Sequence, residues 1–229
     1  MPNCPPATAD YDGYRREGQR YPLTNETSLW AQSEVSQVNS VQTATRSNGE
    51  QEPMSTAQRQ YVLKICVVGE GAVGKTSLII RYTEGHFRES YLMTIGTGFA
   101  VKELDLGDTL VRLQLWDLAG QPHFSSVRPV FYRGAAGLIL VFDVTRRETF
   151  DKVPTWYEEV QQVTGDLTGV LLANKVDMLD QRRVTAEEGQ ALARQRGWTY
   201  FETSAKDGKG VADAFRQIAT QAIDRGRSR

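Results

Sequence analysis

The chain has 229 residues, and its 27 lysines and arginines nearly balance its 28 aspartates and glutamates, which gives a formal net charge of −1 at pH 7. This length suits one ordinary domain plus an extension, and the charge balance excludes the polybasic composition that is typical of electrostatic binding to nucleic acids or anionic membranes. The two cysteines form no disulfide framework, and no apolar run approaches membrane-spanning length. We therefore expect a cytoplasmic protein that binds no nucleic acid.

Residues 1–58 differ in composition from the rest of the chain. They are rich in Ser, Thr, Gln, Asn and Glu and contain neither Ile nor Phe. Such a segment buries too little apolar surface to offset the entropy lost on ordering, so we predict a disordered N-terminal extension. Val35, Val38 and Val41 recur every three residues within it. A short partner-binding helix is one interpretation, but chance spacing is favoured because short isolated helices are marginal in water.

From residue 59 to residue 225, strand-like and helix-like segments alternate, which predicts one α/β domain with helices on both faces of a sheet. The predicted strands are 64–68, 99–106, 110–116, 138–142, 170–173 and 198–201. The predicted helices are 76–82, 149–163, 185–196 and 211–223. Gly107-Asp108 between the second and third strands is a hairpin signal, so one strand of this six-stranded, mostly parallel sheet should be antiparallel. Residues 226–229 would form a short C-terminal tail.

A phosphate-binding motif lies between the first predicted strand and the first predicted helix. It has the pattern G-x-x-x-x-G-K-T and runs from Gly69 to Thr76. Its glycines let the backbone wrap around an anion, and the helix N-terminus adds unpaired N–H donors. We expect Lys75 to reach the β- and γ-phosphates and the Thr76 hydroxyl to bind Mg²⁺. The residues expected to contact the nucleotide here are Gly71, Ala72, Val73, Gly74, Lys75, Thr76 and Ser77.

A second motif follows the third predicted strand, at the sheet edge where open α/β sheets bind ligands. Asp117 there can hold Mg²⁺, directly or through water. The backbone N–H of Gly120 could meet a γ-phosphate, and Gln121 can orient an attacking water. These three residues predict that the site reads the terminal phosphate of a nucleotide.

Two further motifs predict that the base is guanine. Asp177 closes the sequence Asn174-Lys175-Val176-Asp177, which follows the fifth strand. A carboxylate facing a purine can accept two N–H bonds only if the ring carries donors at N1 and N2, as guanine does and adenine does not. Ser204-Ala205-Lys206 follows the last strand, where a backbone N–H can contact the guanine O6. An ATP-using enzyme on the same phosphate loop is the disfavoured alternative.

Residues 60–225 resemble small GTPases of the Ras superfamily, with the Rab branch the most similar. Beyond the nucleotide motifs, the resemblance rests on four segments, which are 131–135, 143–145, 188–193 and 201–206. It implies a P-loop NTPase fold, the G-domain, that binds GTP or GDP with Mg²⁺. It also implies a molecular switch that hydrolyses GTP slowly, in intracellular signalling or membrane traffic.

The resemblance also assigns roles to individual residues. Thr94 matches the threonine that closes over Mg²⁺ and the γ-phosphate, and Phe87 matches the aromatic that packs across the guanine. Asn174 and Lys175 would brace the phosphate loop and the base. Gln121, Lys75 and Thr94 would carry catalysis, and no arginine is evidently placed to complete the site in cis. Unaided turnover should then be about 10⁻⁴ to 10⁻³ per second.

The resemblance further implies partners for a monomeric switch. An exchange factor, a GTPase-activating protein and effectors would bind residues 84–98 and 118–130, which should order with GTP and loosen with GDP. Several positions depart from the usual Rab pattern, namely Met93, Thr97-Gly98, Leu118 and Pro122-His123. Pro122 should restrict Gln121 to extended conformations. A nucleotide-stabilised interaction module with little hydrolysis is therefore the alternative to a hydrolytic switch.

The C-terminal sequence departs from the Rab pattern as well. It contains none of the cysteines that carry prenyl groups in Rabs, so we expect no direct lipid anchor and recruitment to membranes by a partner.

Overall fold

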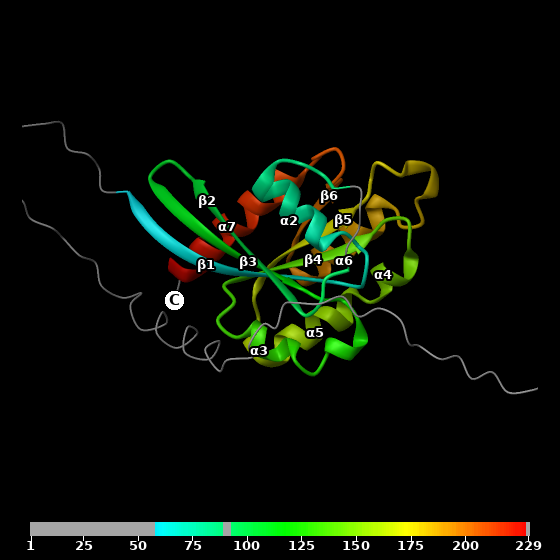
Figure 1. Cartoon of the computed structure of the whole chain (residues 1–229), viewed down its shortest axis with the longest axis horizontal. Helices are drawn as coiled ribbons and strands as arrows, with labels where there is room; N and C mark the ends of the chain where they lie inside the picture. Colours follow the sequence, from blue (N-terminus) through cyan, green and yellow to red (C-terminus); the bar gives the residue numbers. More distant parts are fainter. Residues whose placement is uncertain (1–57, 89–92, 228–229) are drawn as a thin grey trace, which may run out of the picture. The chain divides into compact units, whose positions relative to one another are not determined.

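The computed structural model describes residues 58–88 and 93–227 (Figure 1). The predicted disordered extension up to residue 57, its valine-spaced segment and residues 228–229 lie outside the described residues, as do residues 89–92 of the first predicted partner-binding segment. The strands are β1 (Arg59–Val68), β2 (Thr97–Asp105), β3 (Thr109–Leu118), β4 (Gly137–Asp143), β5 (Thr168–Asn174) and β6 (Thr199–Thr203). The α-helices are α2 (Lys75–Glu84), α3 (Arg128–Tyr132), α4 (Arg147–Asp151), α5 (Val153–Thr164), α6 (Ala186–Arg196) and α7 (Val211–Arg227).

The six strands form one sheet in the order β2-β3-β1-β4-β5-β6. β2 pairs with β3 in antiparallel fashion, and every other neighbouring pair is parallel. The hairpin turn occurs at the predicted place, where Gly107 has φ 89° and the Leu106 N–H donates to the Thr109 carbonyl at 2.9 Å. The prediction of a mostly parallel six-stranded sheet with one antiparallel strand is therefore confirmed.

Two hydrophobic cores separate the sheet from its helices. Figure 1 shows α2 and α7 on one face of the sheet and α3 and α5 on the other. Alternate side chains of β1 belong to different cores. Ile65 and Val67 pack with α2 and α7, whereas Cys66 and Val68 pack with α3, α5 and α6. β4 is buried along its whole length, as expected for a parallel strand covered on both faces. This packing fixes the carboxyl ends of the strands, where the predicted site residues lie.

Three features of the helices bear on the predictions. The single helix predicted over 149–163 is wrong, because the structure divides this stretch into α4 and α5 on either side of Lys152. Pro154 lies in the first turn of α5 and has no N–H to continue the preceding helix. The capping Thr185 predicted for the next helix is confirmed, since its side chain and that of Glu188 cap each other's backbone N–H groups at the start of α6. No helix among the described residues is both long and apolar enough to span a membrane.

Candidate functional site

The phosphate-binding motif forms the turn between β1 and α2. Gly74 has φ 97°, and a Cβ at this position would lie 2.4 Å from Asn174 Nδ2, so only glycine fits. The buried Lys75 ammonium donates to the carbonyls of Gly69 at 2.7 Å and Glu70 at 2.8 Å. Burial lowers the pKa of Lys75 to about 8, against the opposing effect of the Asp117 carboxylate. The loop therefore holds a buried cation beside its own backbone.

The three residues predicted to bind the metal lie together. Thr76 Oγ1 is 2.7 Å from Thr94 Oγ1 and donates to Asp117 Oδ2 at 2.5 Å, and Thr94 Oγ1 is 3.3 Å from the same carboxylate oxygen. Asp117 is almost fully buried, and its other oxygen, Oδ1, has no hydrogen-bond partner among the residues that the structure describes. Burial raises the pKa of Asp117, although hydrogen bonds from Thr76 and Thr94 oppose this effect. The cluster thus contains a buried carboxylate oxygen available to a cation.

Gly120 and Gln121 follow this cluster. A Cβ at Gly120 would lie 2.5 Å from the backbone of the phosphate loop. The segment that follows β3 can therefore lie against the loop only if this residue is glycine. Gln121 has φ −75° and ψ 144°, the extended conformation that was predicted from the following Pro122. Its Oε1 atom is buried and has no hydrogen-bond partner within residues 58–88 and 93–227. Gln121 therefore follows a residue that lies against the phosphate loop, and its side chain carries an unsatisfied acceptor.

The motif Asn174–Asp177 begins at the last residue of β5 and contacts the phosphate loop. Asn174 Nδ2 donates to the Val73 carbonyl at 2.8 Å, and Thr203 Oγ1 donates to Asn174 Oδ1 at 3.3 Å. Lys175 has φ 69°, which is uncommon for a residue other than glycine. Its ammonium lies 2.7 Å from Asp143 Oδ2. Asn174 and Lys175 are thus fixed by buried partners on β6 and β4.

The motif that ends at Asp177 also contacts the motif that begins at Ser204. Ser204 Oγ donates to Asp177 Oδ1 at 2.7 Å and so orients the carboxylate that is predicted to read the base. The carbonyls of Ala205 and Lys206 accept hydrogen bonds from the guanidinium of Arg81 on α2, at 2.7 Å for Ala205. Arg81 therefore ties the loop after β6 to the helix that follows the phosphate loop.

The two remaining predicted residues occupy less polar positions. Phe87 is partly buried against the core that α2 and α7 share, and Ser77 lies in the first turn of α2. Contact of either residue with a nucleotide stays a prediction.

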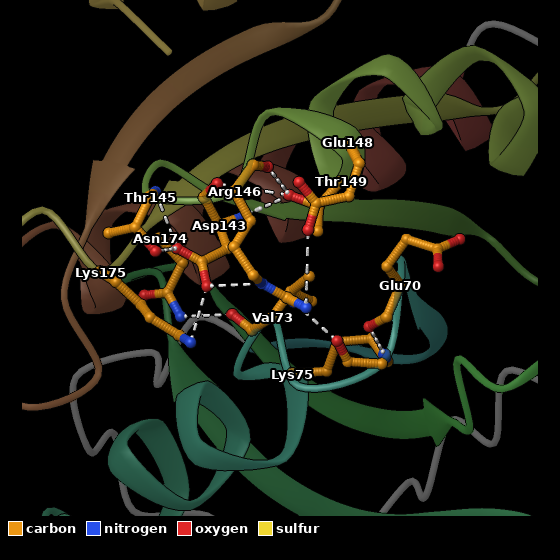
Figure 2. Close-up of polar contacts among 11 residues, drawn as sticks. Glu70, Val73, Lys75, Asp143, Thr145, Arg146, Glu148, Thr149, Asn174 and Lys175 are labelled. Carbon is orange, nitrogen blue, oxygen red and sulfur yellow. Dashed lines mark hydrogen bonds and ion pairs between the residues drawn. The ribbon is translucent and has the colours of Figure 1, made fainter. Parts of the chain in front are cut away.

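Sequence reasoning missed Asp143 and Arg146 (Figure 2). Asp143 is the last residue of β4, and its side chain is only 1% exposed. Burial alone would raise its pKa, but hydrogen bonds from Lys175 and Thr145 outweigh this effect and hold the pKa below its ordinary value. Arg146 donates to Asp143 and to the Gly71 carbonyl of the phosphate loop. The rule that ligands lie at the carboxyl ends of strands would have drawn attention to Asp143.

A second cluster missed by the sequence reasoning anchors the segment after Gln121. Arg128 forms two bonds of 2.7 and 2.8 Å with the Glu159 carboxylate on α5, and it donates to the Gln121 carbonyl at 3.1 Å. Tyr132 donates to the same carboxylate at 2.7 Å. Trp156 Nε1, one turn earlier on α5, donates to Glu70 of the phosphate loop at 3.0 Å. Apart from the bond to Gln121, these contacts join residues 27 to 86 positions apart, so no local pattern could indicate them.

The site has the chemistry expected for a magnesium-bound nucleotide. Among the residues that the structure describes, there is no group of three or more His, Cys, Asp or Glu that could hold a metal. Mg²⁺ does not require such a group, because it usually keeps water and substrate phosphates as ligands and takes one or two protein carboxylates. One buried carboxylate with an unpartnered oxygen and two hydroxyls therefore fits this ion.

Comparisons with known proteins agree with this geometry. Residues 64–224 match the family model described as the Ras family. The chain is 40% identical over 176 residues to the GTP-binding protein ypt2 of Schizosaccharomyces pombe, a match that covers 75% of this chain and 88% of that protein. It is 38% identical over 167 residues to the Ras-related protein Rab-1 of Theileria annulata, covering 72% of this chain and 76% of the relative. Ras-related protein Rab-21 of Bos taurus is 36% identical over 171 residues, with 74% and 77% covered.

Proposed function

The chain belongs to the Ras family, as a small GTPase of the Rab branch that acts as a GTP-dependent switch in membrane traffic, and from this premise we propose which of its residues bind and hydrolyse GTP. The observation that carries the proposal is the 2.8 Å hydrogen bond from Asn174 to the Val73 carbonyl. It joins the base motif to the phosphate loop, so that one nucleoside triphosphate can span both.

The base end of the site selects guanine through Asp177. Ser204 holds one carboxylate oxygen, which fixes the orientation of the carboxylate toward the base. The two guanine donors at N1 and N2 then satisfy the carboxylate, whereas adenine would leave it desolvated and unpaired. Phe87 packs across the base, and the backbone of Ala205 and Lys206, held by Arg81, faces its O6 atom.

The phosphate end neutralises charge. The backbone amides of residues 71–77 and the Lys75 ammonium bind the β- and γ-phosphates. Thr76, Thr94 and Asp117 hold Mg²⁺, which supplies positive charge against the phosphate oxygens when it is bound. Thr94 lies in the segment that follows α2, so its attachment to this cluster couples that segment to the nucleotide state.

Hydrolysis depends on Gln121. Its buried Oε1 atom has no hydrogen-bond partner in the described part of the chain, and this side chain orients water in line with the γ-phosphate. The reaction needs no covalent intermediate on the protein, because positioning and electrostatic stabilisation carry phosphoryl transfer. Without an arginine from a partner, turnover is slow, on the order of 10⁻⁴ to 10⁻³ per second.

Partners bind the segments on either side of Asp117. Large apolar side chains are exposed there, including Ile95 at 83% and Val130 at 64%, together with Phe99 and Val127. Exposed apolar residues in the chain segments next to Thr94 and Gln121 are suited to partners that distinguish the GTP state from the GDP state. We assign the exchange factor, the activating protein and the effectors to this surface.

Single-turnover hydrolysis of GTP by the purified chain tests the proposal, with bound nucleotide identified by chromatography at the start. Gln121→Leu should lower the rate roughly 10- to 100-fold because it removes the water-orienting group. Gln190→Leu, the same change at an exposed position on α6, should leave the rate unchanged. Equal rates in the wild type and Gln121→Leu would contradict the role of Gln121. Bound adenine nucleotide would contradict the role of Asp177.

A further inference from the structure

We propose that Asp143 and Arg146 are positioning residues that join Lys175 to the Gly71 carbonyl of the phosphate loop and thereby slow the release of bound nucleotide. The inference rests on the proposed nucleotide site and adds two residues to it. Figure 2 shows Lys175, Asp143 and Arg146 in one connected network, with Asp143 between the other two residues. Arg146 Nη2 donates to the Gly71 carbonyl at 2.7 Å, and Arg146 Nε donates to Asp143 Oδ2 at 3.2 Å.

Asp143 is the fixed centre of this network. Its Oδ1 atom accepts hydrogen bonds from the backbone N–H of Thr145 at 2.9 Å and from the Thr145 hydroxyl at 2.7 Å. Its Oδ2 atom accepts from Lys175 at 2.7 Å and from Arg146. A buried carboxylate with both oxygens satisfied is held in one orientation, and it holds its two cationic partners in turn. Asp143 therefore transmits the position of Lys175 to Arg146.

Arg146 uses the shape of its side chain as well as its charge. The guanidinium is a planar fork, so one edge can bond a carboxylate while another N–H reaches a carbonyl. A lysine at this position would keep the charge but could not hold both partners in the same fixed geometry. The side chain is 36% exposed, so its substitution should not open a cavity in either core. The effect of substituting Arg146 on nucleotide release can thus be separated from any effect on folding.

The bond to Gly71 acts on the phosphate loop through peptide geometry. The peptide between Gly71 and Ala72 is trans, and a trans peptide directs its C=O and N–H groups to opposite sides. Arg146 binds the Gly71 carbonyl and so fixes the Ala72 N–H on the side of the peptide away from Arg146. Ala72 has φ 61°, which a residue with a side chain rarely adopts unless its surroundings hold it there. Arg146 thus supports a strained peptide whose amide is proposed to bind phosphate.

Joined in this way, the base end and the phosphate end must open together. Lys175 belongs to the base motif, and Gly71 belongs to the phosphate loop. Without Arg146, the Gly71–Ala72 peptide can rotate while the base stays bound, which gives the nucleotide a stepwise route out of the site. We therefore expect the loss of Arg146 to raise the dissociation rate.

The test measures the dissociation of GDP that carries a fluorescent N-methylanthraniloyl group from the full chain. Arg146→Ala should release it roughly 10- to 100-fold faster, the scale of losing one hydrogen bond from a charged group to a carbonyl. Arg146→Lys should release it nearly as fast as Arg146→Ala. Arg147→Ala is the matched control, because Arg147 is the neighbouring arginine and pairs with Asp151 and Glu188. It removes the same charge and should leave the rate within about twofold of the wild type.

Three results would overturn the inference. These are an unchanged rate in Arg146→Ala, full rescue by Arg146→Lys, and slower GTP hydrolysis with unchanged dissociation, which would place Arg146 on the reacting phosphate instead. Thermal unfolding in saturating GDP checks that each variant is folded. Arg146→Gln, which keeps one hydrogen-bond donor, should be intermediate and remains measurable if the alanine variant unfolds. If guanine nucleotide is absent from the wild type at the start, the proposed site itself is wrong, which is a separate outcome.

Discussion

The candidate site has a base end, which contains Asn174 and Asp177, and a switch end, which contains Asp117 and Gln121. The two ends satisfy their polar groups in different ways. At the base end, Asn174 bonds to both the phosphate loop and β6, and Ser204 holds Asp177. At the switch end, buried oxygens of Asp117 and Gln121 have no hydrogen-bond partner within the described part of the chain. Buried polar atoms are normally paired, so an unpaired one in a native structure requires an explanation. In the proposed site, the base end would therefore be formed before ligand arrives, whereas the ligand would complete the switch end.

The two ends also differ in their anchors. The base motifs are extensions of β5 and β6, whose neighbouring strands fix them. The segment after Gln121 is joined to α5 by side-chain contacts, including the Arg128–Glu159 pair. A segment held by a few side chains can change its conformation without disturbing the sheet. This difference suits a site in which the base end keeps one conformation and the switch end changes its conformation with the state of the nucleotide.

Asp177→Asn should have the largest effect, which is a loss of GDP affinity, because it alters the base end, where the polar groups are already held in place. An amide offers one acceptor where the carboxylate offers two, and it places an N–H against a guanine donor, so GDP affinity should fall roughly 10³-fold. Xanthosine diphosphate, which has a carbonyl in place of the 2-amino group, should lose less. Asp180→Asn is the control, since Asp180 is exposed in the short helix that follows the base motif. Competition binding measures these affinities, and an unchanged GDP affinity would show that Asp177 does not read the base.

Glu159→Gln should have the next largest effect, on stability instead of on binding. It leaves Arg128, whose side chain is only 5% exposed, without a charged partner. The free energy of unfolding should fall by about 2–4 kcal/mol, somewhat less than for a fully buried pair because Glu159 is 25% exposed. Glu158→Gln, an exposed neighbour on α5, should have little effect. Denaturant unfolding in saturating GDP measures both, and equal stability of the two variants would contradict this anchor.

This stability difference should depend on pH. Burial alone would raise the pKa of Glu159, but hydrogen bonds from Arg128 and Tyr132 hold it below its ordinary value of 4.5. A carboxylate whose pKa is lower in the folded state stabilises the fold at pH values above its unfolded pKa and loses that contribution as the pH falls through the folded value. The difference between wild type and Glu159→Gln should therefore be constant from about pH 6 to 8 and shrink below about pH 4.5. A difference that grows toward acid pH would contradict the assignment.

Local spacing in the sequence was enough to predict some parts of the candidate site. The phosphate loop and the base motif each follow a strand, and a short pattern of residue types is enough to indicate them. The sequence did not predict the start of β1 at Arg59, because residues 59–63 are not an apolar run. These residues are in the strand because they pair with Thr109–Leu113 of β3, which is a tertiary contact.

Most of the supporting contacts could not be predicted for the same reason. Arg146 meets Gly71 and Arg128 meets Glu159 across 75 and 31 residues of chain, so their partners are set by how the helices pack on the sheet. Spacing within the sequence carries no information about such pairs. The division between α4 and α5 was in principle predictable, since Pro154 lies in the middle of the helix that was expected.

Pro122→Ala should have the smallest effect and tests how freely the switch end moves. Pro122 disfavours helical backbone conformations of Gln121, and the observed ψ of 144° is among those that remain. Alanine would widen this range, and if Gln121 must rotate to orient water, GTP hydrolysis should become about 2- to 5-fold faster, which corresponds to about 0.4–1 kcal/mol of conformational restriction. GDP affinity should stay unchanged because the base end does not contact Pro122. Pro129→Ala, in the first turn of α3, is the control for a general loosening of this segment. An unchanged or slower rate in Pro122→Ala would mean that Gln121 already occupies its working conformation and that its unpaired Oε1 atom awaits only water.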